Sequence, residues 1–307
     1  MGRIQTILGD IKPGEMGVTY SHEHLMTRPP NNVINGDVDL LVDDPSKPRQ
    51  ELAIFKAAGG ETVVEMTPRH YGRNLPVMVE ASRTTGVHVI ACSGWLKGAY
   101  FPRETEELSK TQLADIVIRE VTEGMDGTRI KAGVVKAGTM YNTMSATEEK
   151  VLRAVAIAAK ETGALASTHT EKGTMGVEQV EVMVSEGLDP SRIAIGHIDQ
   201  NIDPYIHLKI VRMGAYVLYD GFSKIKYGPD AERVSLLRML REKGYGKQIL
   251  ISCDMGRRSY WKSYGGGPGF DYILKKFLPR LLDEGFPKEF VDDLILANPH
   301  RAFAIEK

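Results

Sequence analysis

Four histidines and one aspartate stand where they could bind a metal ion. His22 and His24 are two residues apart, so on a β-strand both side chains would point to the same face of the sheet. Three more candidate ligands each end a different apolar run, namely His169, His197 and Asp254. Four imidazoles and a carboxylate suit Zn²⁺ or a similar divalent ion. A lone histidine would favour an ordinary structural role, but a His-x-His pair with two further histidines at strand ends favours a metal site.

Lys136 closes an apolar run at residues 132–135, where burial would lower the pKa of its amine. It could form a Schiff base, as in barrel aldolases, or point to the loops without a function. Alternatively, its neutral amine could take up CO₂ and form a carbamate that bridges two metal ions. The four imidazoles favour the carbamate, because a Schiff-base enzyme does not need them and a two-metal site needs a bridging anion.

Apolar runs alternate with amphipathic segments along the chain, which is typical of βα units around a parallel sheet. The expected strands are residues 17–24, 62–66, 88–93, 130–136, 164–169, 192–197, 215–220 and 248–254. Residues 148–161 show helical spacing, and Ser145 with Glu148 predicts a capping box before them. The absence of a Gly-x-Gly-x-x-Gly motif after a strand disfavours a dinucleotide-binding sheet. We therefore predict an α/β fold, a (β/α)₈ TIM barrel forming a single domain over residues 1–307, with the ligands at the carboxyl ends of its strands.

The composition disfavours several classes of partner. Lys and Arg number 39 against 40 Asp and Glu, which gives a formal net charge of -1 and no basic field for nucleic acid. No apolar run reaches the roughly 18 residues of a membrane span. Cys92 and Cys253 lie in apolar runs and are expected to be reduced thiols. These features predict a cytoplasmic protein that acts on a small molecule, without nucleic acid or membrane as a partner.

Taken together, the motifs resemble the phosphotriesterase-like branch of the amidohydrolase superfamily, and within it the sugar-lactone lactonases. The resemblance covers nearly the whole chain and is carried by residues 17–24, 131–136, 167–170, 196–199, 252–254 and 298–303. It implies a binuclear hydrolase, and a homodimer is common among such relatives. Zn²⁺ is the expected metal, although Mn²⁺ and Co²⁺ accept the same donors.

The resemblance also implies roles for the individual side chains. His22, His24 and Asp254 would hold the more buried metal ion. The more exposed ion would be held by His169 and His197, with a carboxylated Lys136 and a hydroxide bridging the two ions. Asp254 would take the proton of the hydroxide and pass it to the leaving group.

Two loops near Asp254 point to an anionic substrate. The seventh loop (residues 220–230) and the eighth (residues 254–262) carry five cations and two tyrosines, and barrels commonly bind phosphate there. The resemblance to lactonases for phosphorylated sugar lactones assigns four residues to the phosphate, namely Lys226, Tyr227, Arg257 and Tyr260. It also leads us to expect a lysine in the loop after the sixth strand, where this chain has Gln200.

The predicted function is therefore metal-dependent opening of a lactone ring, with an anionic and phosphorylated sugar lactone as the favoured substrate. An acyl-homoserine lactonase is less favoured because these loops lack a long apolar stretch for an acyl tail. A phosphotriesterase is less favoured because lysine and arginine suit an anion better than a neutral triester. A metal-containing binding protein is the remaining alternative, against which the complete set of candidate ligands argues. The glycines at residues 265–269 indicate either a mobile flap over the site or a turn required by packing.

Overall fold

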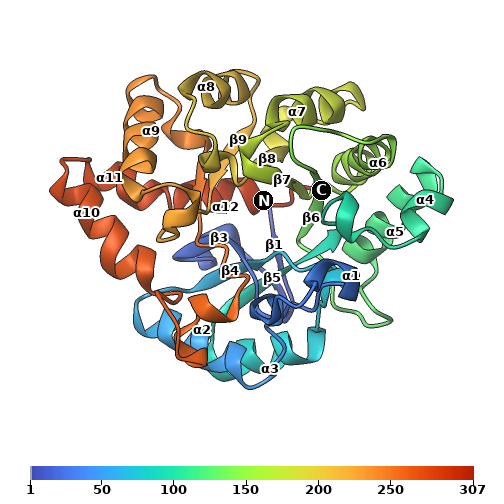
Figure 1. Cartoon of the computed structure of the whole chain (residues 1–307), viewed down its shortest axis with the longest axis horizontal. Helices are drawn as coiled ribbons and strands as arrows, with labels where there is room; N and C mark the ends of the chain where they lie inside the picture. The colour runs from blue at the N-terminus through green and yellow to red at the C-terminus, as the bar shows by residue number, and fades with distance from the viewer. Residues whose placement is uncertain (1) are drawn as a thin grey trace.

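The computed structural model describes residues 2–307, in which eight parallel strands curve into a barrel with helices around it (Figure 1). Strand order along the sheet follows the sequence, so each strand pairs in parallel with the next one. The barrel strands are β3 (Thr19–Glu23), β4 (Thr62–Glu65), β5 (His88–Gly94), β6 (Val134–Thr139), β7 (Leu165–Thr170), β8 (Ile193–Gly196), β9 (Tyr216–Tyr219) and β10 (Ile249–Ile251). The predicted (β/α)₈ TIM barrel is confirmed.

Helices separate the strands because a parallel pair needs a crossover connection. The longer ones are α2 (Lys47–Ala57), α3 (Leu75–Thr85), α5 (Lys110–Thr122), α6 (Ala146–Thr162), α7 (Gly176–Ser185), α8 (Pro204–Arg212) and α9 (Asp230–Glu242). Shorter ones are α1 (Asn31–Ile34), α4 (Glu104–Glu107), α10 (Leu278–Asp283), α11 (Lys288–Asp293) and α12 (Ala297–Phe303). The predicted capping box starts α6, where Ser145 N donates to Glu148 Oε2 at 2.8 Å and Glu148 N donates to Ser145 Oγ at 3.2 Å.

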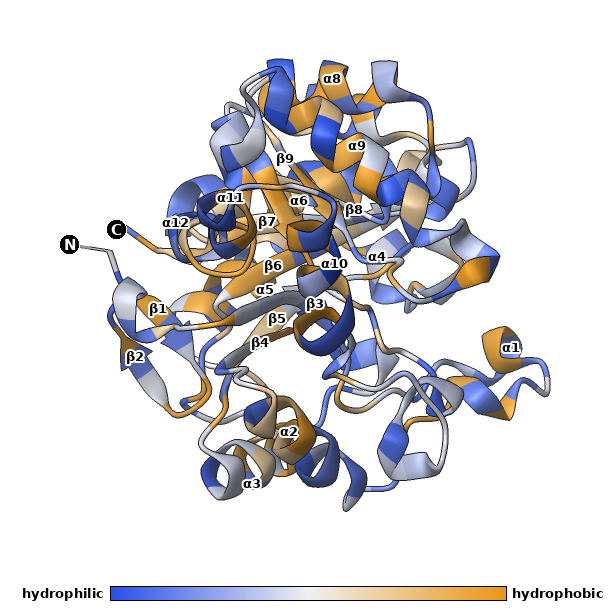
Figure 2. Cartoon of the chain, turned by 90° about the vertical axis from the view of Figure 1, so that its left-hand side faces the viewer, coloured by the Kyte–Doolittle hydropathy of each residue, from blue (hydrophilic) through white to orange (hydrophobic). Residues whose placement is uncertain are grey.

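Apolar side chains alternate along the strands between the barrel interior and the layer under the helices. Val64 and Ile90 belong to the inner cluster, whereas their neighbours Val63 and Val89 pack against the helices. In Figure 2 the strands are mostly hydrophobic, while the surrounding helices carry hydrophilic stripes. No helix within residues 2–307 is long and apolar enough to cross a membrane.

The two faces of the barrel differ. A short hairpin of β1 (Ile4–Thr6) and β2 (Gly9–Ile11) lies at the amino end of the barrel strands, and Arg3 pairs there with Ile305 near the other terminus. Figure 2 shows both termini and this hairpin on one side and α1 on the opposite side. The opposite side therefore carries the loops that follow the strands.

The largest error among the predicted strand boundaries concerns the fourth barrel strand. The fourth barrel strand was expected at residues 130–136, but β6 spans Val134–Thr139. It continues beyond Lys136 because Ala137 and Thr139 pair with Thr168 and Thr170 of β7. Lys136 therefore lies inside the strand and not at its end.

The seam between the first and last barrel strands is closed by one side chain. Glu23 of β3 accepts hydrogen bonds from Ser252 Oγ at 2.7 Å, Cys253 N at 2.8 Å and Met255 N at 2.9 Å. In addition, Asp254 N donates to His22 O at 3.1 Å. The middle residue of the His-Glu-His motif thus fixes the start of the eighth loop beside the two histidines.

Candidate active site

His22, His24 and Asp254 meet at the seam between β3 and β10. Asp254 Oδ1 lies 3.2 Å from His24 Nε2 and 3.9 Å from His22 Nε2. One ligand atom from each of the three residues can be chosen so that all three lie within 4.8 Å of one another. The structure therefore brings together the three residues predicted to share one metal ion.

His22 gives a specific test of whether this cluster fits a metal. Its side chain is fully buried, yet neither ring nitrogen has a hydrogen-bond partner among the described residues. Buried polar atoms without partners are rare in folded proteins and call for a water, an ion or a ligand. Burial also holds the pKa of His22 well below its usual value, so the neutral ring keeps a lone pair for a cation. These donors fit a divalent metal.

His197 follows β8 and is oriented by Asp220. Its Nδ1 donates to Asp220 Oδ1 at 2.7 Å, which leaves Nε2 as the lone-pair nitrogen. Asp220 Oδ2 lies 3.4 Å from His22 Nδ1, and these three residues form a second compact group of candidate ligands. Burial raises the pKa of Asp220, against the opposing effect of His197. No role was predicted for Asp220. It directly follows β9, just as Asp254 comes shortly after β10.

His169 lies beside His197, with ring centroids 4.5 Å apart, but it belongs to neither of the two compact groups of candidate ligands. Its Nε2 is 3.2 Å from Lys97 Nζ and 3.3 Å from Glu171 Oε2. Lys97 and Glu171 also form an ion pair with each other. Neither residue was predicted to belong to the site, although each comes shortly after a barrel strand.

Lys136 is fully buried inside the barrel end. Its Nζ donates to Met66 O at 2.6 Å, and burial lowers the pKa of its amine. A lowered pKa increases the share of the neutral amine, which is the form that reacts with CO₂. Lys136 lines the same cavity as His24, His169, His197 and Asp254.

Lys224 is a further neighbour of Asp254 that was counted only as one of the loop cations. It is 4% exposed, and its Nζ donates to Asp254 O at 2.8 Å and approaches Asp254 Oδ2 at 3.4 Å. Burial would raise the pKa of Asp254, but Lys224 and the surrounding histidines outweigh burial and hold it well below its usual value. Asp254 is thereby kept as a carboxylate.

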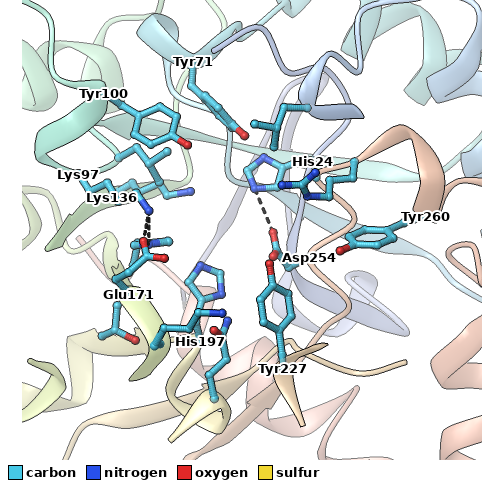
Figure 3. Close-up of a pocket in the computed structure, with 18 residues that line it drawn as sticks. His24, Tyr71, Lys97, Tyr100, Lys136, Glu171, His197, Tyr227, Asp254 and Tyr260 are labelled. Carbon is cyan, nitrogen blue, oxygen red and sulfur yellow. Dashed lines mark hydrogen bonds and ion pairs between the residues drawn. The ribbon is translucent and has the colours of Figure 1, made fainter. Parts of the chain in front are cut away.

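The cavity above these residues has a volume of about 200 Å³, room for a small molecule. Tyr227, Arg257 and Tyr260, three of the residues predicted to hold the phosphate, line it together with Gln200. Figure 3 shows Tyr227 and Tyr260 near Asp254, with Tyr71 and Tyr100 across the cavity. These two tyrosines were not predicted.

The predicted anion-binding residues differ in how close they come to the cavity. Lys226 is exposed and is not among the lining residues, but its Nζ lies 4.8 Å from the centroid of the Tyr227 ring and 5.3 Å from that of Tyr260. Arg257 Nη1 donates to Asp37 Oδ2 at 2.8 Å. The Tyr260 hydroxyl is buried without a partner among the described residues, so a ligand oxygen could accept from it.

The glycine-rich segment after the eighth loop is packed against its surroundings. Gly266 N donates to Trp261 O and Gly269 N to Tyr260 O, both at 2.9 Å. A Cβ on Gly269 would lie 2.8 Å from Lys262 side-chain carbons. Of the two interpretations of these glycines, the geometry favours a turn required by packing.

Comparison with known proteins gives consistent matches over nearly the full chain. A family model described as the phosphotriesterase family matches residues 2–303. The phosphotriesterase homology protein of Escherichia coli strain K12 is 38% identical over 290 residues, which cover 94% of this chain and 98% of that protein. A structure of a phosphotriesterase homology protein from E. coli with phosphate in its active site matches with a TM-score of 0.90 at 37% identity, over 94% of this chain and 99% of that one.

Two further matches are lactonases. The phospho-furanose lactonase of Mycoplasmopsis synoviae strain 53 is 30% identical over 325 residues, which cover 99% of this chain and 92% of that protein. The structure of a lactonase from Listeria monocytogenes has a TM-score of 0.95 at 38% identity, over 99% of this chain and 100% of that one. The resemblance inferred from the motifs is confirmed.

Proposed function

The chain belongs to the phosphotriesterase family and is a hydrolase, and from that premise we propose that it opens the ring of a phosphorylated sugar lactone. The observation that carries this proposal is the position of Tyr227, Arg257 and Tyr260, which line the same small cavity as the histidines and Asp254. One end of the substrate would thus meet cations and hydroxyl groups while its ester meets Asp254. The phospho-furanose lactonase among the relatives supports this substrate class.

We assign the metal ligands as the sequence motifs imply. His22, His24 and Asp254 would hold one divalent ion and His169 and His197 the other, with Lys136 between them as a carbamate. Carbamate formation joins the neutral Lys136 amine to CO₂ and releases one proton. When bound, two such ions, Zn²⁺ or else Mn²⁺ or Co²⁺, would polarise the lactone carbonyl and make a water molecule more acidic. The orphaned ring nitrogens of His22 support this assignment.

The protein's own residues then handle the proton. Asp254, kept ionised by Lys224, would accept the proton that the attacking water loses. As the ester bond breaks, Asp254 would pass that proton to the ring oxygen, so that lactone and water become one hydroxy acid. Asp220 would hold His197 in the tautomer with Nε2 free.

Two alternative activities fit the cavity less well. A neutral phosphotriester would offer no negative charge to Lys226, whose Nζ lies 4.8 Å from the centroid of the Tyr227 ring beside the cavity. An acyl-homoserine lactone carries an apolar tail, whereas tyrosines and charged side chains predominate among the residues that line the cavity. Binding without catalysis would use Asp254 only as a metal ligand and not as a proton acceptor.

The test compares a 5-phosphorylated pentonolactone with the same lactone lacking phosphate, using metal-loaded protein and a pH indicator. We expect kcat/KM to be at least about tenfold higher for the phosphorylated lactone. Equal kcat/KM values for the two lactones would show that the protein does not recognise the phosphate. Metal-loaded protein that is inactive on every lactone and ester would favour the binding-protein alternative.

A further inference from the structure

The end of the cavity lined by Tyr227, Arg257 and Tyr260, called here the anion-binding end, receives a further cation from the loop after β7. Lys172 lies directly after β7, in the turn Glu171–Gly173, and lines the cavity. Its Nζ is 4.6 Å from the centroid of the Tyr227 ring, and Lys226 Nζ is 4.8 Å from the same centroid. Ammonium groups from two separate loops therefore converge on one tyrosine of the anion-binding end.

The loop of Lys172 is held against the loop of Gln200. Asn201 Nδ2 donates to Gly173 O at 3.4 Å, and a Cβ on Gly173 would lie 2.7 Å from Asn201 N. Only glycine permits this close approach, which is made with a φ of +67°. Gln200 and Lys172 thus reach the same cavity from two touching loops.

Lys172 has a strained backbone conformation that a lysine side chain does not favour. Its φ is 54° and its ψ is 31°, in the left-handed region where glycine and asparagine are the favoured residues. A lysine in this conformation costs stability, and such outliers gather at functional sites. The cost suggests a role for the charged side chain.

The charges at this end are incompletely neutralised by the protein. Lys224 contacts Asp254, and Arg257 contacts Asp37 and Asp39. Within residues 2–307, no carboxylate oxygen lies within 4.0 Å of Lys172 Nζ or Lys226 Nζ. Partial burial of the Lys226 ammonium lowers its pKa, and repulsion from other cations, including Lys172, adds to the effect. A bound anion would relieve this repulsion.

We propose that Lys172 is a substrate-binding residue that supplies positive charge to the phosphate from the loop after β7, in place of the neutral Gln200 in the next loop. This inference rests on the proposed function. Lys172, Lys226 and Arg257 would then surround a phosphate dianion, and the unpartnered Tyr260 hydroxyl would donate to it. Lys172 thereby favours phosphorylated over neutral lactones.

The first experiment changes the charge and keeps the backbone conformation. Lys172→Asn removes the ammonium and places a residue that tolerates the left-handed region, whereas Lys172→Arg keeps the charge. The matched control is Lys209→Asn, which removes an exposed lysine from the outer helix α8. We expect Lys172→Asn to lower the ratio of kcat/KM for phosphorylated over unphosphorylated lactone about tenfold. Lys172→Arg and Lys209→Asn should each keep the ratio within about twofold of the unsubstituted protein.

A second variant tests whether a positive charge in the loop after β8 can replace the one in the loop after β7. Adding Gln200→Lys to Lys172→Asn moves the charge back to the loop after β8. We expect this double variant to recover at least half of the lost ratio on a logarithmic scale. If the double variant has the same ratio as Lys172→Asn alone, a lysine at position 200 cannot replace Lys172, and the proposed exchange of charge between the two loops is wrong.

Inorganic phosphate separates this inference from the proposed function. Its affinity is measured by calorimetry on unsubstituted protein, Lys172→Asn and Lys209→Asn with equal metal content. If no lactone is hydrolysed but Lys172→Asn alone binds phosphate several-fold more weakly, the proposed function fails and the role of Lys172 stands. If the unsubstituted protein prefers the phosphorylated lactone and Lys172→Asn keeps both this preference and the phosphate affinity, the role of Lys172 is overturned and the proposed function stands.

Discussion

Two regions of the active site are built in opposite ways. One region, called the buried region below, consists of the four histidines and Asp254. These residues lie in or just after barrel strands, and His22 is fully buried. The cationic rim (Lys172, Lys226, Tyr227, Arg257 and Tyr260) lies entirely in loops, and its two lysines are exposed. Hydrogen bonding of the sheet fixes the first region, whereas contacts between loops fix the second.

The rim contains no strand, and the Arg233 side chain helps to hold its loops in place. This fully buried side chain donates to Asp199 Oδ2 at 2.5 Å, Tyr227 O at 2.9 Å and Gly228 O at 2.8 Å. It thus ties the loop after β8 to the loop after β9. Lys224 is the one cation of the seventh loop that turns inward, where it contacts Asp254 and links the two regions.

The largest effect is expected from Asp254→Asn, which breaks the buried region. We expect kcat for the lactone to fall about a thousandfold, because the proton of the attacking water loses its acceptor. Asp115→Asn on the exposed face of α5 is the matched control and should leave kcat unchanged. The rates come from the pH-indicator assay, and circular dichroism checks the fold. If Asp254→Asn kept kcat within about tenfold, another group would have to accept the proton.

The next largest effect concerns Lys136 and the metal content. Lys136→Met keeps most of the side-chain volume but removes the amine, and we expect it to lose most of the bound metal and about a hundredfold in activity. Lys136→Glu supplies a carboxylate directly and should keep the metal. Elemental analysis after gel filtration measures both. Full metal content and activity in Lys136→Met would exclude the carbamate.

The buried region was predictable because its residues follow from strand order and alternation. His22 and His169 lie within β3 and β7, as their apolar runs indicated. His197 and Asp254 fall beyond the strand ends, where their backbones take positive φ angles of 58° and 48°. Neither position holds glycine or asparagine, so the sequence carried no sign of these turns. Asp220 ends an apolar run and could have been found by the same rule as Asp254.

The rim was predictable only in part, because spacing does not show which way a loop residue points. Lys224 and Lys226 are two residues apart in one loop, yet the first is buried against Asp254 and the second is exposed. Lys172 belongs to another loop, and its place beside Tyr227 depends on the packing of Gly173 against Asn201. Such contacts between loops leave no periodic pattern in the sequence.

A smaller effect is expected from Lys226→Gln, which changes the rim and leaves the buried region intact. We expect kcat/KM for the phosphorylated lactone to fall about tenfold, mainly through a higher KM, because one charged contact to the phosphate is lost. Lys209→Gln on α8 removes an equal charge from a residue that does not line the cavity and serves as the control. A fall in kcat of the same size for phosphorylated and unphosphorylated lactones would place Lys226 in the chemical step instead.

The smallest expected effect is the dependence of KM on salt, and it can be measured without a mutation. Charges in water are screened over about 10 Å at 0.1 M salt and about 3 Å at 1 M, whereas buried pairs are screened much less. Because Lys172 and Lys226 are exposed, we expect KM for the phosphorylated lactone to rise about threefold as sodium chloride increases from roughly 0.05 to 0.5 M. KM for the unphosphorylated lactone and both kcat values should change little, since Lys224 is buried and contacts Asp254 directly. Equal salt dependence for the two lactones would mean that the rim does not recognise the phosphate through charge, and the contrast between the two regions would lose its electrostatic basis.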